Sequence, residues 1–245
     1  DGIHIIDLAK TKEGLENAAK TLQEAAAAGQ DILFVGTKRQ AKTILKEQAT
    51  RIGAHFLTER WIGGFLTNWD TIHKNLEKIR KMEEEEKSGA WKKFPKHEQL
   101  KLSRYLGRTK MVYGGVISLY DVPKVLVVLD IRKEKAAVEE AKIRGIVTIG
   151  IVDTNADPTQ VDFPIPANDD AVGSITFITN YLTRAYEEGR KQFDVTREKE
   201  AQEMEKKKKE AEKKAEAPKK VVEEKPVEPK AEESKTEKPA KAKKA

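Results

Sequence analysis

Residues 125–153 read VLVVLDIRKEKAAVEEAKIRGIVTIGIVD, and the pattern of this stretch indicates the fold class. Apolar runs at 125–129 and 146–152 flank a charged segment at 133–144, which Gly145 ends. Strands that are apolar throughout are typical of a sheet covered on both faces. The succession of strand, helix and strand therefore predicts two parallel strands joined by a right-handed helical crossover.

The same alternation continues on both sides of this stretch. Hydrophobic periodicity predicts, in chain order, a β-rich run, a helix, a strand, a helix, an extended segment and a helix, at residues 3–8, 12–28, 31–36, 38–52, 163–165 and 170–190. We therefore expect an α/β fold, a doubly wound parallel sheet with helices on both faces, built from residues 1–68 and 113–195.

Residues 69–112 interrupt this alternation with two helical patterns. The first covers 69–86 and repeats apolar residues every three or four positions, at Trp69, Ile72, Leu76, Ile79 and Met82. The second has the same spacing at Leu102, Leu106 and Thr109. Two such helices joined by a short link predict an inserted antiparallel coiled-coil hairpin that projects from the α/β body.

The charge of the chain is unevenly distributed. The 245 residues carry a formal net charge of +6. Residues 70–112 hold 12 basic and 7 acidic side chains, and residues 197–245 hold 17 and 13, so the remainder is mildly acidic. Basic appendages on an acidic body indicate a polyanionic partner, of which nucleic acid is the commonest.

The composition also excludes some kinds of site and structure. The sequence has no cysteine, which excludes disulfides and thiolate metal sites. No apolar run approaches the ~20 residues that span a bilayer, so we expect no membrane partner. Residues 196–245 are rich in Lys, Glu, Ala and Pro, which predicts a charged helical extension followed by a disordered tail from Pro218 onward.

Two strand ends could carry chemistry. Asp130 and Asp153 follow buried strands, where they could form a carboxylate pair for metal or acid–base chemistry, or cap turns and helices. Residues 36–39, GTKR, lie between a strand and a helix and could bind a phosphate, although they match no nucleotide-binding motif. We expect capping to be the role of the two aspartates, and we predict no catalytic, cofactor or metal site.

Residues 60–68, RWIGGFLTN, form the most unusual segment of the sequence. As a structural hinge, the segment would bury Trp61 and Phe65 under the hairpin, and Asn68 would cap the next helix. As a binding segment, it would let a sugar–phosphate backbone approach the two glycines, with Arg60 on a phosphate. The two interpretations are compatible.

Several of these motifs resemble the bacterial form of a known family, small ribosomal subunit protein two. The resemblance rests on RWIGGFLTN at 60–68, VDTNADP at 152–158 and DFPIPANDD at 162–170, with IHIIDL, FVGTKRQA and GRTKMVYGG in matching order. It implies a non-enzymatic protein of the cytoplasmic ribosome without a cofactor. Its partners would be small-subunit rRNA and other small-subunit proteins, including the large multidomain protein that recruits messenger RNA.

The resemblance also implies which residues contact RNA. They come from the GTKR turn, from residues 60–68 and from the basic positions of the predicted hairpin. The expected RNA-binding residues are Lys38, Arg39, Arg60, Trp61, Gly63, Gly64, Thr67, Asn68, Lys74, Lys78, Arg104, Arg108 and Lys110.

Two rival hypotheses remain at this point. A nucleotide- or metal-dependent enzyme would use Asp130, Asp153 and the GTKR turn, and a nucleotide would stabilise it. An interaction scaffold would bind protein partners through the hairpin, and this binding would be insensitive to ribonuclease.

Overall fold

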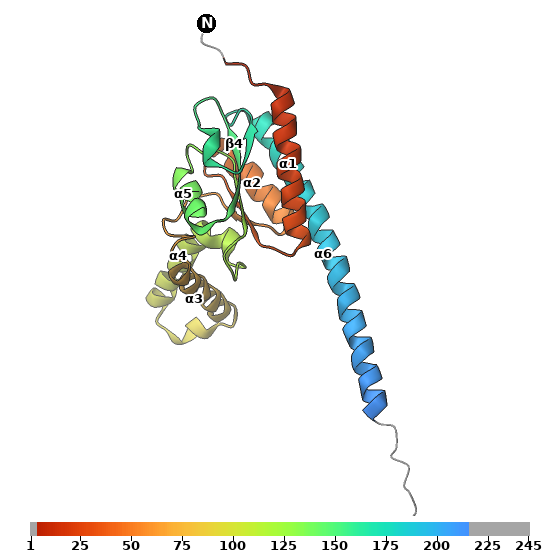
Figure 1. Ribbon diagram of the computed structural model, residues 1–245. Coiled ribbons are helices and arrows are strands. Elements are labelled where there is room, and N and C mark those ends of the chain that lie inside the picture. The colour runs from red at the N-terminus through yellow and green to blue at the C-terminus, as the bar shows by residue number, and fades with distance from the viewer. Residues whose placement is uncertain (1–3, 216–245) are drawn as a thin grey trace, which may run out of the picture. The chain divides into compact units, whose positions relative to one another are not determined.

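A computed structural model describes residues 4–215 of the chain (Figure 1). The described residues up to Glu200 belong to one compact unit, and those from Ala201 onward to a second. The helix α6, Val172–Ala215, begins in the first unit and ends in the second. The disorder predicted from Pro218 onward lies outside the described residues.

The first unit is built on a five-stranded sheet in which every neighbouring pair is parallel. Its strands are β1 Ile32–Val35, β2 His55–Leu57, β3 Val125–Val128, β4 Val147–Val152 and β5 Phe163–Pro166. Their order across the sheet is β2-β1-β3-β4-β5, with Phe34 opposite both Phe56 and Val127. The predicted parallel α/β sheet is thus confirmed.

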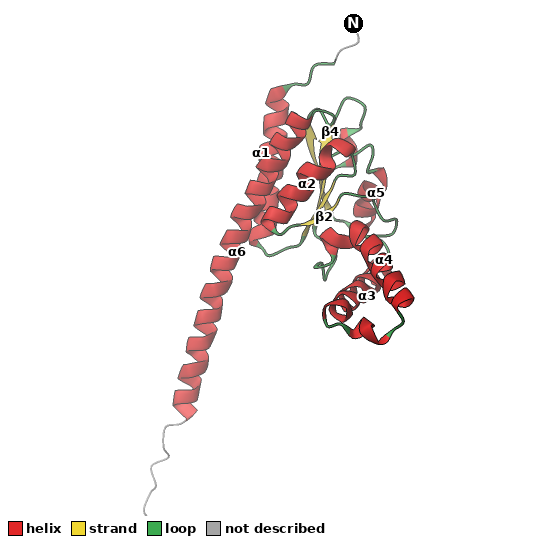
Figure 2. Ribbon diagram, turned by 180° about the vertical axis from the view of Figure 1, so that it is seen from behind, coloured by secondary structure: helices red, strands yellow, loops and turns green. Residues whose placement is uncertain are grey.

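Helices cover both faces of this sheet (Figure 2). Ile32 and Phe34 of β1 pack into a core with α1 Leu8–Ala27, α2 Arg39–Ile52 and the start of α6. Leu33 and Val35 face the other way, into a core with α5 Lys135–Arg144. Side chains of a strand alternate between faces, so a strand that is apolar throughout supplies both cores at once.

Helices α3 Trp69–Lys87 and α4 Lys96–Tyr113 follow the loop after β2 (Figure 1). The short 3₁₀ helix Ala90–Lys93 lies between them, and the 3₁₀ helix Gly114–Val116 follows α4. The predicted apolar stripe of α3 is buried, and it belongs to the same core as Leu33 and Val35 of the sheet. The helix pair is therefore anchored in the body's own core and does not bury its stripe solely against itself.

Two side-chain contacts connect α3 and α4. Lys78 lies over the ring of Tyr105, and Glu83 pairs with Lys110 at 2.8 Å. Neither contact is the apolar knobs-into-holes packing that defines a coiled coil. The coiled-coil part of the prediction is not confirmed, and the separation of residues 69–112 as a domain stays a prediction.

Two local expectations differ from the structure. The β-rich run predicted at residues 3–8 is wrong for the part that is described. Residues 4–7 form no strand, Ile5 is 94% exposed, and Leu8 begins α1 behind Asp7, whose Oδ1 accepts a hydrogen bond from Ala9 N. Strand β2 was not predicted, because its three residues are too few to display a period of two.

No helix within residues 4–215 combines the length and the apolar character that crossing a membrane requires.

Gly189 tests the packing of α6 on α1. A Cβ atom at this buried glycine would lie 2.8 Å from Ala26 Cβ and closer still to the carbonyl oxygen of Gln23. We expect Gly189→Ala to lower the free energy of unfolding by about 1–3 kcal/mol in urea titrations, because the two helices must move apart.

Gly173, near the start of the same helix, is the matched control. A Cβ atom there would meet nothing within 4 Å. Gly173→Ala should therefore change the free energy of unfolding by no more than about 0.5 kcal/mol. Equal effects of the two substitutions would contradict the packing of α6 on α1.

Candidate nucleic-acid interface

The strand order identifies where an open sheet of this kind offers a ligand site. Strands β1 and β3 are adjacent, and the connections from them lead to opposite sides of the sheet. Ligands of such folds bind outside the carboxyl ends of the strands at this switch point. In this chain the GTKR turn follows β1, and Asp130 and Glu134 follow β3.

A lysine and three aspartates occupy this position. Lys38 Nζ lies 2.6 Å from Asp169 Oδ1, 2.6 Å from Asp170 Oδ1 and 3.3 Å from Asp130 Oδ2. The Lys38 side chain is only 16% exposed. Burial alone would lower the pKa of Lys38, but the hydrogen bonds to Asp169 and Asp170 outweigh it, so the pKa is raised and the ammonium stays charged.

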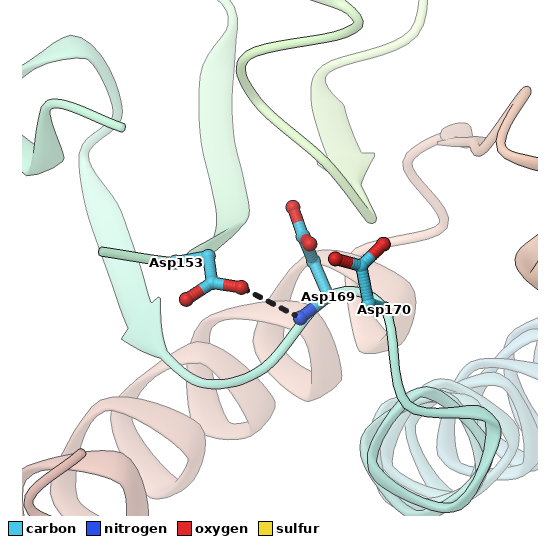
Figure 3. A group of neighbouring side chains, drawn as sticks. All are labelled: Asp153, Asp169 and Asp170. Atoms are coloured by element: carbon cyan, nitrogen blue, oxygen red, sulfur yellow. Dashed lines mark hydrogen bonds between the residues drawn. The ribbon is translucent and has the colours of Figure 1, made fainter. Parts of the chain in front are cut away.

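A further aspartate, Asp153, lies beside Asp169 and Asp170 (Figure 3). The side chains of Asp153, Asp169 and Asp170 place oxygen atoms within 4.8 Å of one another, a spacing that could hold a metal ion. Burial and the negative charges of Asp130 and Asp153 raise the pKa of Asp169 despite its contact with Lys38. The Lys38 ammonium pairs with two of these three carboxylates, Asp169 and Asp170.

The aspartates at the strand ends also accept hydrogen bonds from backbone amides. Asp130 Oδ1 accepts a hydrogen bond from Lys133 N at 2.8 Å, and Asp153 Oδ1 accepts one from Thr154 N at 2.6 Å. Both contacts are the capping role expected from the sequence.

The amide of the GTKR turn is engaged by a carboxylate as well. Thr37 donates to Glu134 Oε1 through its backbone N, at 3.0 Å, and through its hydroxyl. Lys133 Nζ in turn donates to the carbonyl oxygen of Thr37 at 3.1 Å. Of the two predicted RNA-binding residues in this turn, Lys38 is held by carboxylates and Arg39 is exposed.

The segment at 60–68 is held by Glu140, a residue of α5 that the sequence did not single out. Glu140 Oε1 accepts hydrogen bonds from the indole of Trp61 at 2.9 Å and from the amide of Gly64 at 2.8 Å. Glu140 Oε2 accepts bonds from the amides of Leu66 and Thr67 at 2.9 and 3.2 Å. These bonds outweigh the effect of burial and lower the pKa of Glu140.

Arg144 completes this clamp one helical turn further along α5. Its Nε donates to the carbonyl oxygen of Leu66 at 2.8 Å, and its guanidinium also reaches that of Thr67 at 3.2 Å. A Glu and an Arg four residues apart on a helix usually suggest an ion pair between them. Here each side chain binds the loop, which is why the sequence pattern gave no sign of the role of Glu140.

The clamp limits what the predicted binding segment can offer to RNA. The amide of Gly64 is already bonded and the indole of Trp61 is half-buried. Gly63, Thr67 and Asn68 are exposed, and Asn68 precedes α3 without a side-chain capping bond. The clamp and the burial of Phe65 support the hinge interpretation, but the side-chain cap expected from Asn68 is wrong. The RNA contacts of the segment stay a prediction.

Three of the predicted RNA-binding cations meet at a pocket between α3 and α4. The pocket has a volume of about 390 Å³ and is lined by three cations, two tyrosines, two polar and two apolar residues: Arg60, Lys78, Arg108, Tyr105, Tyr113, Asn75, Thr109, Ile79 and Val112. Burial raises the pKa of Tyr113, and the positive charge of Arg60 opposes this shift. The lining contains no carboxylate, which distinguishes this pocket from the switch point of the sheet.

The other predicted positions on these helices lie outside the pocket. Lys74 and Arg104 are exposed. Lys110 is paired with Glu83. The α3–α4 pocket, defined by the nine residues above, and the exposed basic residues beside it form the candidate site.

Removal of the Glu140 carboxylate should loosen the clamp. Glu140→Ala leaves the Trp61 indole and three amides without their acceptor, so we expect the free energy of unfolding to fall by about 1–3 kcal/mol. Because the pKa of Glu140 is lowered on folding, its contribution is present above the ordinary value near 4.5 and disappears as the pH falls through the lowered value. Urea titrations between neutral and acidic pH measure both effects.

Glu139, the neighbouring exposed residue, is the control for this experiment. It forms only a surface pair with Lys135 at 3.6 Å. Glu139→Ala should cost no more than about 0.5 kcal/mol. A loss as large as that of Glu140→Ala would argue against the clamp.

Removal of the Lys38 ammonium should destabilise the sheet edge. Lys38→Met leaves Asp130, Asp169 and Asp170 without their shared cation, and we expect a loss of roughly 3 kcal/mol at neutral pH. The pKa of Lys38 is raised on folding, so the wild-type contribution is fully present below the ordinary value of 10.5 and is lost as the pH rises through the raised value. The deficit of the variant should shrink in acid, where the carboxylates take up protons.

Lys42, one turn further along α2, is the matched control. It pairs with Glu59 at 2.9 Å in a contact that is about one third exposed. Lys42→Met should change stability by less than about 1 kcal/mol at every pH. A pH-independent deficit in Lys38→Met would contradict the proposed charge balance.

Comparisons with known proteins identify the same family as the sequence motifs. The profile of the family "Ribosomal protein S2" matches residues 1–189. "Small ribosomal subunit protein uS2" of Microcystis aeruginosa is 44% identical over 191 residues, which cover 78% of this chain and 72% of that protein. The protein of the same name from Amoebophilus asiaticus is 46% identical over 202 residues, which cover 82% of this chain and 64% of that protein. The chain therefore belongs to the ribosomal protein S2 family, a family of structural proteins and not of enzymes.

Proposed function

We propose that the chain is a structural constituent of the small ribosomal subunit in the cytoplasm, where it binds small-subunit rRNA and neighbouring ribosomal proteins and supports assembly and translation. The observation that carries this proposal is the α3–α4 pocket, where Arg60, Lys78 and Arg108 come together without a carboxylate. The names of the relatives support the assignment to the small subunit. The pocket is the surface through which we expect RNA to bind.

The three cations of the α3–α4 pocket are available to phosphates. Among the residues that the structure describes, Arg60, Lys78 and Arg108 have no carboxylate within 4.0 Å. Like charges that are gathered without a counter-ion repel one another, and a polyanion relieves that repulsion. Lys74 and Arg104 extend the basic surface along the two helices.

The remaining predicted contacts contribute in different ways. Arg39, Gly63, Thr67 and Asn68 are exposed and available to RNA. The Lys38 ammonium is held by carboxylates, so its main role is to fix the loop ends. We also propose that the large multidomain protein that recruits messenger RNA is among the partners, as the family resemblance implies.

Sedimentation of a cell lysate through a sucrose gradient tests the proposal. We expect the chain to migrate with small subunits and to lose this migration after ribonuclease digestion. Charge reversal of the pocket in the variant Arg60→Glu, Lys78→Glu, Arg108→Glu should strongly reduce incorporation, because phosphate contacts become repulsive. Migration that survives ribonuclease would favour an RNA-free scaffold.

A second triple variant controls for net charge alone. Lys10, Lys20 and Lys46 are exposed on α1 and α2, and their reversal to Glu changes the net charge by the same amount. Incorporation should remain close to wild type in this control. Equal losses in both variants would show that total charge, and not the pocket, governs incorporation.

A further inference from the structure

We propose that the α3–α4 pocket receives an unstacked nucleotide from a single-stranded part of the RNA, with its base against Tyr105 and its phosphates on the surrounding cations. The inference rests on the proposed function and names the form of RNA that the pocket would recognise. It follows from the shape of the site, from its aromatic residues and from the distribution of its charges.

The shape of the site favours a single nucleotide over a duplex. A duplex presents its phosphates as an outer ridge and is recognised by shape across a broad surface. The site on this chain is a concave pocket of about 390 Å³ between two helices, within the range of pockets that hold small ligands. Bases enter such pockets when they are splayed out from loops, bulges or ends.

Tyr105 supplies a face on which a base can stack. Its side chain is 45% exposed although it lines the pocket. Lys78 Nζ lies over the ring at 5.6 Å from its centroid, a long contact for which an RNA phosphate can compete. Stacking on an exposed tyrosine and pairing of a nearby cation with phosphate are the two elements of single-strand recognition.

Polar side chains that line the pocket can form hydrogen bonds with the edge of the base. The Asn75 amide offers both donors and an acceptor. The Thr109 hydroxyl donates its proton to the carbonyl oxygen of Tyr105 at 2.8 Å, which leaves its oxygen as an acceptor towards the pocket. Ile79 and Val112 provide an apolar floor, so the site combines the features of a base pocket with cations at its rim.

The test compares single-stranded and duplex RNA with the purified full chain. Fluorescence anisotropy would use a labelled oligonucleotide of about 12 residues and the same strand annealed to its complement. We expect tighter binding of the single strand, and a loss of about tenfold in that affinity for Tyr105→Ala. Tyr105→Phe keeps the aromatic face and should retain the wild-type affinity.

Tyr120 is the matched control for Tyr105. It is 64% exposed and carries Arg80 at 4.1 Å from its ring centroid, but it does not line the pocket. Tyr120→Ala should leave the affinity unchanged. An equal loss for Tyr120→Ala and Tyr105→Ala would overturn the proposal, because it would place the effect outside the pocket.

Salt dependence separates stacking from phosphate contacts. Tyr105→Ala should weaken binding without changing the slope of log affinity against log salt, whereas Lys78→Ala should reduce the slope by ~0.7 for each phosphate released. A preference for the duplex, or an affinity that does not respond to loss of the Tyr105 ring, would overturn the proposal.

Failure of this inference can be told apart from failure of the proposed function. A chain that sediments with small subunits in a ribonuclease-sensitive manner, but shows no ring-dependent preference for single strands, would disprove only the nucleotide pocket. A chain absent from small subunits would disprove both.

Discussion

The carboxylate of Glu140 forms the contact on which the placement of α3 depends. Its two oxygens accept hydrogen bonds from the indole of Trp61 and from three backbone amides within residues 64–67. Arg144 donates to two carbonyl oxygens of the same segment. Side chains of α5 therefore bind both the backbone N–H donors and the carbonyl acceptors of this segment. Because α3 begins only two residues later, the direction of the helix is set by this clamp together with the apolar core beneath it.

The two turns predicted to bind phosphate show what a sequence can reveal about such a site. The GTKR turn and the RWIGGFLTN segment do present amide donors, as their glycines and positions before helices indicate. The acceptors are the carboxylates of Glu134 and Glu140, which lie 97 and 76 residues away from the donors at Thr37 and Gly64. Local sequence identifies the donors, whereas the acceptor is decided by how the sheet brings distant loops together.

The fold was predictable where the signal was long and periodic. Strands β1 and β3 are apolar throughout, β4 is apolar except for Thr148, and the helices carry apolar stripes, so the parallel sheet could be predicted from the pattern. Strand β2 forms by pairing with β1, and its three residues are too few to predict this pairing from the sequence. Residues 4–7 show the converse, since β-forming side chains there form no strand.

The acidic body and the basic surface are connected through the same segment. Carboxylates neutralise Lys38, and the loop amides are bonded to Glu134 and Glu140, so neither turn leaves these groups for an anion. Arg60 directly precedes Trp61, whose indole Glu140 fixes, and this places the Arg60 guanidinium at the α3–α4 pocket. In the proposed recognition of RNA, the glycine-containing segment would therefore act by position: its amides hold it to α5, and its first residue completes a cationic pocket that no carboxylate lines.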